Sequence, residues 1–216
     1  MEILTRDRLA SLPRRRLHGG RNWTKAVVEV VETGGGPIVL KDLAARSWPV
    51  RLLLGPSQLD RETRAYRLLR DLPGVPRFLG RVDRAAIALE YIAGPDLGSV
   101  RGGDLPPSFL DRLERVLDGI HARGVAHGDL HRRDVLIGPG GAPYIVDFST
   151  ALAAGPDPDP LLRFLFSQMC RSDRRSLAKL RRRLLPGARA PVPPRPALYR
   201  IVRPVRALFD LLRRRR

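Results

Sequence analysis

The chain contains the stretch His127-Gly-Asp-Leu-His-Arg-Arg-Asp134, followed by Tyr144-Ile-Val-Asp-Phe-Ser149. Asp129 lies in a predicted loop after a helix, Asp134 follows it by 5 residues, and Asp147 ends a short apolar strand. Transfer of a phosphoryl group needs such a set, because one carboxylate orients the acceptor hydroxyl and two oxygen ligands hold magnesium against the phosphates. Each acid alone is more often a surface residue in a turn, but the combined spacing of the three favours a site for phosphoryl transfer.

Apolar periodicity and turn residues on both sides of this stretch predict an α+β fold. Before it we expect strands at residues 24–31, 37–41, 78–82 and 85–90, a turn at 33–36, and a helix at 57–72 with Ser57 as its N-cap. A connector covers 91–97, and an amphipathic helix covers 109–120. Short strands follow at 135–137 and 143–146, and then helices at 161–185 and 203–212 with a proline-rich linker at 191–196 between them.

Lys41 and Glu62 are predicted to form a buried ion pair. Lys41 is one of three lysines in the chain and ends an apolar strand, so its ammonium needs an anionic partner. Glu62 shares the apolar face of the predicted helix with Leu59, Tyr66 and Leu69, so its carboxylate also needs a partner. Pairing the two satisfies both requirements. The alternative is a surface lysine and a glutamate at the edge of the apolar face.

The stretch 127–148 resembles the catalytic and magnesium-binding loops of the protein-kinase-like superfamily. Its His-Gly-Asp-Leu-His form is similar to small bacterial kinases, in particular the lipopolysaccharide (Kdo/WaaP-type) and RIO-type kinases. The resemblance implies a two-lobed fold, with a small β-rich N-lobe at residues 1–92 and a mostly helical C-lobe at 93–186. Residues 187–216 would form the proline-rich linker and a basic amphipathic helix.

The resemblance also implies an ATP- and Mg²⁺-dependent kinase that phosphorylates a hydroxyl of a lipopolysaccharide-type saccharide or a protein serine or threonine. Asp129 would then be the catalytic base, and Asp134 and Asp147 the magnesium ligands. Lys41, braced by Glu62, would align the α- and β-phosphates.

Two weaker nucleotide contacts follow from the same resemblance. Gly19 and Gly20, in His18-Gly-Gly-Arg-Asn22, precede a strand where backbone N–H groups could cover phosphates. This segment is not a GxGxxG motif and by itself indicates only a turn. Glu90 and Ile92, in Leu89-Glu-Tyr-Ile92, resemble the hinge that pairs with adenine through its backbone.

Three residues depart from the family pattern. Asp134 replaces the usual asparagine, which leaves open a pseudokinase or membrane-associated ATP-binding module without turnover. Ser149 replaces a glycine and should restrict backbone motion after Asp147. Gly128 replaces the arginine that meets a phosphorylated activation loop in regulated kinases. His131 is expected either to contact substrate or phosphate, or to be structural.

Charge is concentrated at the C-terminal end. The net charge is +18, and residues 161–216 contain 17 basic and 2 acidic side chains, which leaves +15 there. The predicted helix at 203–212 has an apolar stripe bordered by arginines, which favours contact with an anionic membrane surface. A helix packed on its own domain with a solvated arginine edge is the alternative, and the few aromatics argue against nucleic acid.

Composition is that of a folded protein in a reducing compartment. Hydrophobic residues make up 43% of the 216 residues, enough for one sizeable core or two small lobes. The single cysteine cannot form a disulfide framework, and neither a signal peptide nor an apolar run of about 18 residues is evident. We therefore expect a cytoplasmic protein, with the basic tail as the feature that would place it at the inner face of a membrane.

Overall fold

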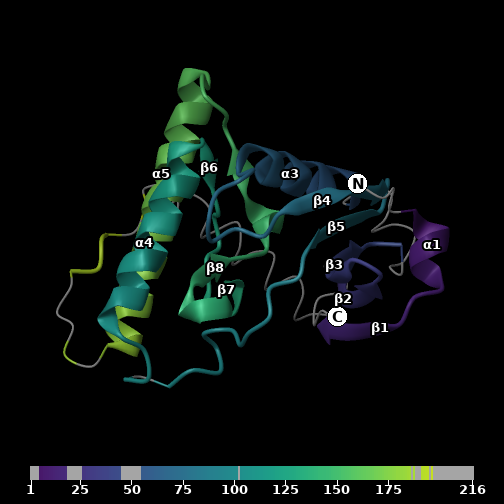
Figure 1. Ribbon diagram of the computed structural model, residues 1–216. Coiled ribbons are helices and arrows are strands. Elements are labelled where there is room, and N and C mark those ends of the chain that lie inside the picture. The colour runs from purple at the N-terminus through teal and green to yellow at the C-terminus, as the bar shows by residue number, and fades with distance from the viewer. Residues whose placement is uncertain are drawn as a thin grey trace, which may run out of the picture.

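An antiparallel sheet of five strands forms the N-lobe (Figure 1). The computed structural model describes residues 5–18, 26–44, 55–101, 103–185, 187, 191–194 and 196. The strands follow one another across the sheet in the order β1-β2-β3-β5-β4. They are β1 (Arg14–His18), β2 (Val27–Thr33), β3 (Gly36–Asp42), β4 (Phe78–Asp83) and β5 (Ala86–Glu90).

The β2–β3 hairpin sets the direction in which Lys41 points. The strands pair from Val27 with Asp42 to Thr33 with Gly36, and the predicted turn closes them. Alternate side chains of a strand point to opposite faces. Leu40 therefore packs in a small cluster on one face, while Lys41 points to the other face, toward helix α3 (Gly55–Leu68).

Helix α3 differs from its prediction at both ends. It begins at Gly55, so the expectation that Ser57 is the N-cap is wrong. It ends at Leu68 rather than residue 72, and Asp71 then adopts a left-handed conformation with φ of 60°. Pro73, two residues after Asp71, cannot continue a helix, and the apolar periodicity extends about one turn beyond the helix.

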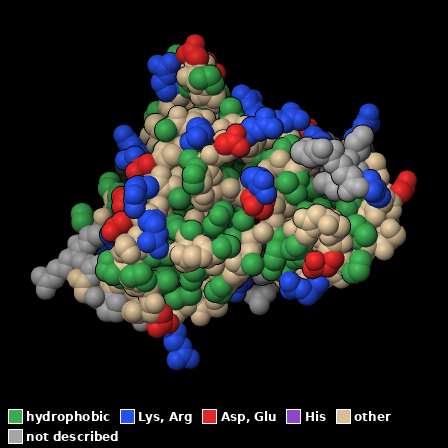
Figure 2. Space-filling model, viewed as in Figure 1, with side chains coloured by type: hydrophobic (Ala, Val, Ile, Leu, Met, Phe, Trp, Pro, Cys, Tyr) green, Lys and Arg blue, Asp and Glu red, His purple; other side chains and the backbone are tan. Residues whose placement is uncertain are grey.

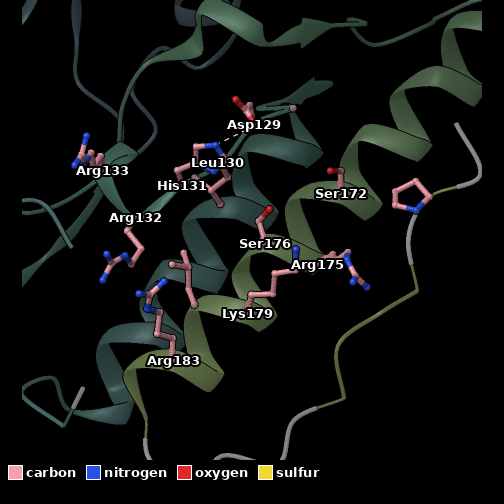
Figure 3. Close-up of a pocket in the computed structure, with 13 residues that line it drawn as sticks. Asp129, Leu130, His131, Arg132, Arg133, Ser172, Arg175, Ser176, Lys179 and Arg183 are labelled. Carbon is pink, nitrogen blue, oxygen red and sulfur yellow. Dashed lines mark ion pairs between the residues drawn. The ribbon is translucent and has the colours of Figure 1, made fainter. Parts of the chain in front are cut away.

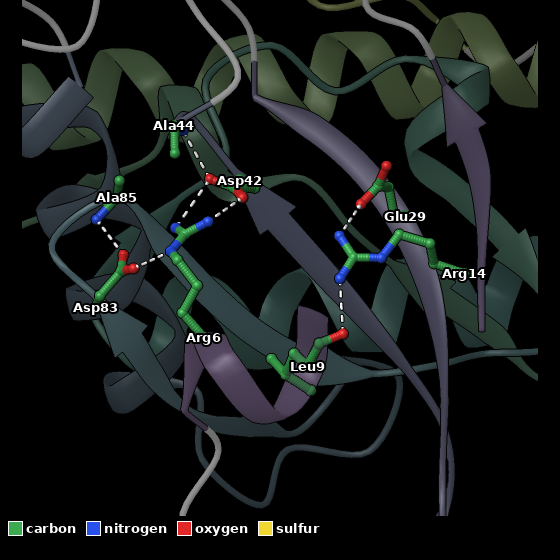
Figure 4. A network of polar contacts seen from close by, with 8 residues as sticks. All are labelled: Arg6, Leu9, Arg14, Glu29, Asp42, Ala44, Asp83 and Ala85. Atoms are coloured by element: carbon green, nitrogen blue, oxygen red, sulfur yellow. Dashed lines mark hydrogen bonds and ion pairs between the residues drawn. The ribbon is translucent and has the colours of Figure 1, made fainter. Parts of the chain in front are cut away.

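No pattern in the sequence predicts the first two elements, α1 (Arg6–Ala10) and β1. Arg6 joins α1 to the sheet because its guanidinium bonds Asp42 at 2.7 and 3.2 Å and Asp83 at 2.5 Å (Figure 4). Each carboxylate also accepts a backbone N–H, from Ala44 and Ala85 respectively. Leu9 is buried against the same sheet.

Two long helices lie side by side in the C-lobe, α4 (Pro107–Ala122) and α5 (Pro160–Leu184) (Figure 1). Between them in the sequence come short elements that fix the loops. These are β6 (Val125–Ala126), β7 (Val135–Ile137), β8 (Pro143–Ile145), β9 (Leu152–Ala153) and the 3₁₀ helices η1 (Arg132–Asp134), η2 (Pro139–Gly141) and η3 (Phe148–Thr150). Strand β6 pairs with β9, and β7 pairs with β8. Both acidic loops of the motif are therefore anchored at each end by strand pairing.

One hydrophobic cluster continues from the sheet through α3 into the C-lobe. It includes Leu59 and Ile87 from the N-lobe side, and Leu113 and Phe148 from the C-lobe side. The α+β architecture is the predicted one, and the division at residue 92 stays a prediction. The predicted helix at 203–212 and the basic tail lie outside the described residues.

Charged side chains of opposite sign are interspersed along the α4–α5 side of the molecule (Figure 2). Arg174 on α5 pairs with Asp118 on α4, and Arg181 pairs with Asp111 and Glu114. Part of the arginine excess in α5 is thus neutralised by α4. Among the helices that the structure describes, none is long and apolar enough to cross a membrane.

We expect Arg6→Ala to lower the free energy of unfolding by about 1–2 kcal/mol, because two hydrogen-bonded carboxylates lose their partner at a half-exposed site. Arg6 holds the pKa of Asp83 below its ordinary value. This stabilisation is present at neutral pH and is lost as the pH falls through the lowered pKa. The difference in the free energy of unfolding between wild type and Arg6→Ala should therefore become smaller below about pH 4.

Urea unfolding at several pH values measures this effect, with Arg163→Ala as the matched control. Arg163 forms an exposed pair with Asp157 at 3.8 Å, so its loss should change stability by less than about 0.5 kcal/mol. Equal effects of the two substitutions would show that Arg6 does not fasten α1 to the sheet.

Candidate active site

Asp147 lies at the turn between β8 and η3, with φ of 66° and ψ of 68°. This left-handed conformation is uncommon outside glycine but is tolerated by aspartate. The neighbouring Phe148 is fully buried and packs edge-on against Tyr66 of α3, with ring centres 5.1 Å apart. The buried phenylalanine thus fixes the turn, and the Asp147 side chain stays 30% exposed.

Lys41 is held by two carboxylates from different parts of the chain. Its Nζ donates to Glu62 Oε1 at 2.5 Å and to Asp147 Oδ1 at 2.9 Å. The side chains of Lys41 and Glu62 are only 9% and 2% exposed. The ion pair that the two burial arguments predict is therefore present, and it extends to Asp147.

Burial and charge oppose one another in this group. Desolvation by itself would lower the pKa of Lys41, but the charges of Asp147 and Glu62 outweigh it and hold that pKa well above its ordinary value. Burial raises the pKa of Glu62, and the Lys41 charge opposes this rise. One ammonium thus serves two carboxylates, and Asp147 is the more exposed of the two. Asp147 is consequently the carboxylate with room for a further cation.

Asp129 lies in the loop between β6 and η1, and its side chain is 44% exposed. The adjacent Leu130 is buried and anchors the loop in the core. His131 Nε2 lies 3.3 Å from Asp129 Oδ1, which gives this histidine a contact with the predicted base. Asp129 is therefore presented to solvent from a rigid loop.

Asp134 closes the same loop. Its Oδ2 accepts the His131 N–H at 2.8 Å, and its carbonyl accepts the Val146 N–H, also at 2.8 Å. Burial raises the pKa of the Asp134 carboxyl, and the negative charge of Asp147 adds to this rise. The two predicted magnesium ligands are thus close enough to repel one another.

Asp173 is a residue that motif reasoning missed. It is fully buried on α5, and its two oxygens accept the backbone N–H groups of His127 and Gly128, each at 2.8 Å. One oxygen also lies 3.1 Å from His121 Nε2. A single carboxylate therefore holds the start of the Asp129 loop on α5.

A signal for Asp173 is present in the sequence. It lies at helical spacing from Leu177, Leu180 and Leu184, all of which are buried. An acid on an apolar face needs partners, which is the argument that identified Glu62. The apolar face of α5 therefore predicts a buried contact for Asp173.

The backbone at Gly128 leaves no room for a side chain. Its φ is +85°, and an added Cβ would lie 2.9 Å from the Thr150 carbonyl oxygen. A side chain at this position meets both an unfavourable backbone conformation and a backbone atom that cannot move aside. A residue with a Cβ at position 128 would therefore strain the loop, which explains the glycine.

The remaining predicted residues are not drawn into this group. Glu90 ends β5, where Arg77 accepts its N–H and pairs with its carboxylate. Ile92 is buried just beyond. Gly19 and Gly20 lie outside the described residues. Within the part of the chain that the structure describes, no three histidine, cysteine or acidic side chains gather as a metal centre.

We expect Asp173→Asn to lower the free energy of unfolding by about 1–3 kcal/mol, because the amide presents one donor to groups that need acceptors. Exchange of the His127 and Gly128 amide hydrogens should accelerate, as measured by hydrogen-exchange NMR. Arg171→Ala, on an exposed part of the same helix, is the control. Unchanged protection of both amides in Asp173→Asn would contradict the anchoring role.

Known proteins with a likeness to this chain are kinases, although no family model matches it. A protein of rice, Oryza sativa subsp. japonica, that carries the name cyclin-dependent kinase F-2 is 41% identical over 83 residues, covering 33% of this chain and 25% of that protein. The Rio2 kinase from Chaetomium thermophilum matches with a TM-score of 0.62 and 18% identity, over 87% of this chain and 62% of its own. Its ADP/Mg²⁺-phosphoaspartate complex matches with a TM-score of 0.62 and 17% identity, over 87% of this chain and 60% of its own.

The chain thus spans about three fifths of the solved kinases and a quarter of the rice protein. At 17–18% identity the structural likeness concerns the fold. The sheet with α3, the strand-anchored loops and the helical C-lobe agree with it. The chain therefore has a protein-kinase-like fold.

Proposed function

We propose that this chain is an ATP- and Mg²⁺-dependent kinase that transfers the γ-phosphoryl group of ATP to a hydroxyl. The observation that carries the proposal is the buried Lys41 ammonium shared by Glu62 and Asp147. Phosphoryl transfer on this type of fold uses a lysine for the phosphates and an acid for the metal. The complex of Rio2 kinase with ADP and Mg²⁺ supports the same ligands here.

The nucleotide would bind between the sheet and the Asp147 loop. Lys41, already braced by Glu62, would donate from Nζ to the α- and β-phosphates. Arg77 accepts the N–H of Glu90 and pairs with its carboxylate, and we assign the carbonyl oxygen of Glu90 to an adenine amino group. We assign Ile92 to the same hinge, and Gly19 and Gly20 to phosphate cover.

Asp147 and Asp134 fit a magnesium site by the chemistry of their donors. Two carboxylates whose charges repel one another are stabilised by a cation between them. Magnesium in such sites is held by one or two carboxylates, with phosphate and water oxygens completing the shell. When bound, the ion neutralises charge that develops on the phosphates.

Asp129 would act on the acceptor. It holds the acceptor hydroxyl in line with the γ-phosphorus and takes its proton as the new oxygen–phosphorus bond forms. The bond from the γ-phosphorus to its bridging oxygen breaks, and ADP leaves with that electron pair. His131, 3.3 Å from Asp129, would orient the carboxylate.

A lipopolysaccharide-type saccharide or a protein serine or threonine is the acceptor class that we propose from the resemblance of the motif. The basic tail would bring a lipid-linked acceptor to the enzyme at the cytoplasmic face of a membrane. Among the described residues, the surface beside Asp129 is the part of the molecule that can recognise such an acceptor.

We expect Asp129→Asn to reduce turnover of Mg²⁺-ATP at least about 100-fold, because the proton acceptor is lost while the shape of the side chain is kept. Transfer of label from γ-labelled ATP to water or to the protein itself measures turnover. Calorimetric titration with Mg²⁺-ATP is the control and should give the same affinity for both proteins. Equal turnover in wild type and variant would remove Asp129 from the mechanism.

A second candidate is an ATP-binding module without turnover, which the extra negative charge of Asp134 beside Asp147 favours. Binding of Mg²⁺-ATP by the wild type, with turnover no greater than in a reaction without protein, would establish it. The phosphoaspartate in the Rio2 complex suggests a further control. Label released from the protein by hydroxylamine would identify a carboxylate as acceptor instead of a hydroxyl.

A further inference from the structure

A pocket of about 640 Å³ opens beside Asp129, between the loop 128–133 and one face of α5 (Figure 3). Its lining includes Asp129 but none of Lys41, Glu62, Asp134 or Asp147. The pocket is therefore distinct from the group that we assign to the nucleotide. Asp129 is the residue that it shares with the proposed chemistry.

The lining of this pocket is strongly basic. Arg132 and Arg133 come from the loop side, and Arg175, Lys179 and Arg183 come from α5. Asp129 is the one acidic side chain among the described residues that line it. Five cations around one carboxylate attract an anionic ligand.

Two sets of basic residues on α5 lie on different faces of the helix. Arg174 and Arg181 pair with acids of α4, as described above. Arg175, Lys179 and Arg183 recur at intervals of four residues and share the face that lines the pocket.

Among the described residues, no acidic side chain forms an ion pair with the cations of the pocket face of α5. Arg175 donates to the uncharged carbonyl of Pro193. Within the described chain, no ion pair engages Arg132, Lys179 or Arg183. Their charge is thus available to a ligand, whereas that of the α4-facing arginines is not.

We propose that this pocket binds the phosphoryl acceptor, and that the acceptor is a saccharide that already carries a phosphate group. Guanidinium groups match phosphate oxygens in pairs, which makes arginine a common phosphate ligand. A pocket of this size suits a small molecule or a sugar headgroup. The inference rests on the proposed kinase activity, since Asp129 must meet the hydroxyl to be phosphorylated.

The pocket extends along α5, which suits an acceptor that lies with its hydroxyl at Asp129 and its phosphate farther along the helix. Figure 3 shows Asp129 and Ser172 at one end of the view and Arg183 at the other. Ser172 and Arg183 are 11 residues apart on α5, which corresponds to about 16 Å along the helix. Lys179 lies between these ends, and the side chains of Lys179 and Arg183 are long. In the proposed orientation, a sugar hydroxyl lies at Asp129 and the phosphate of the same molecule points toward Lys179, with Arg183 beyond it.

The test uses Lys179→Glu/Arg183→Glu and a matched control, Arg171→Glu/Arg182→Glu. All four residues are exposed on α5, and both variants change the net charge equally, but Arg171 and Arg182 do not line the pocket. Calorimetry with glucose 6-phosphate, in the presence of saturating Mg²⁺-ADP, measures acceptor binding, and glucose is the unphosphorylated comparison. Vesicles of phosphatidylcholine with phosphatidylinositol 4-phosphate present a lipid-linked phosphate on a polyol ring with free hydroxyls.

We expect the wild type and the control variant to bind glucose 6-phosphate at least tenfold more tightly than glucose, and the pocket variant to lose this preference. If the pocket variant also loses binding to the vesicles, a lipid headgroup is a second source of the phosphate that the pocket recognises. Absence of the preference in wild type, an equal loss in both variants, or tighter binding of a single-stranded RNA would overturn the inference. Mg²⁺-ATP affinity, titrated separately, distinguishes these outcomes from failure of the proposed kinase activity.

Discussion

The Lys41 ammonium is the interaction on which the rest of the site depends. An isolated buried ammonium would lose its proton or unfold its surroundings. Two carboxylates prevent this, Glu62 from α3 at 2.5 Å and Asp147 from the loop after β8 at 2.9 Å. One buried charge thereby fixes the position of the sheet relative to a helix and a distant loop. The hydrophobic cluster that joins the lobes, with Phe148 between Tyr66 and His127, makes this arrangement rigid.

A second buried charge organises the other half of the site. Asp173 holds the loop before Asp129 on α5 through two backbone N–H groups, and so its role is to position the loop. The two buried acids, Glu62 and Asp173, lie on helices on opposite sides of the acidic loops. Helix α5 consequently has two roles at the site. Asp173 on its buried face holds the loop before Asp129, and Lys179 is among the cations that line the pocket beside Asp129.

Local burial arguments and motif spacing were sufficient for much of this account. The α+β fold and the hairpin that contains Lys41 follow from apolar periodicity and turn residues, and the Lys41–Glu62 pair follows from charges on apolar faces. Helix α1 and β1 could not be predicted, because they contain few apolar residues and are fastened by Arg6, whose partners Asp42 and Asp83 are distant in sequence. The pocket could not be predicted either, since its loop residues (128–133) and its helix residues (172–183) are distant in sequence and only the fold brings them together.

The central claim is that the Lys41 group forms a nucleotide site. Calorimetric titration of Mg²⁺-ATP into wild type, Lys41→Met, Glu62→Gln and the double variant tests it most directly. The account predicts binding by the wild type, a loss of at least tenfold in each single variant, and little further loss in the double variant, because Glu62 acts through Lys41. Unchanged binding by Lys41→Met, or independent and additive losses, would contradict it.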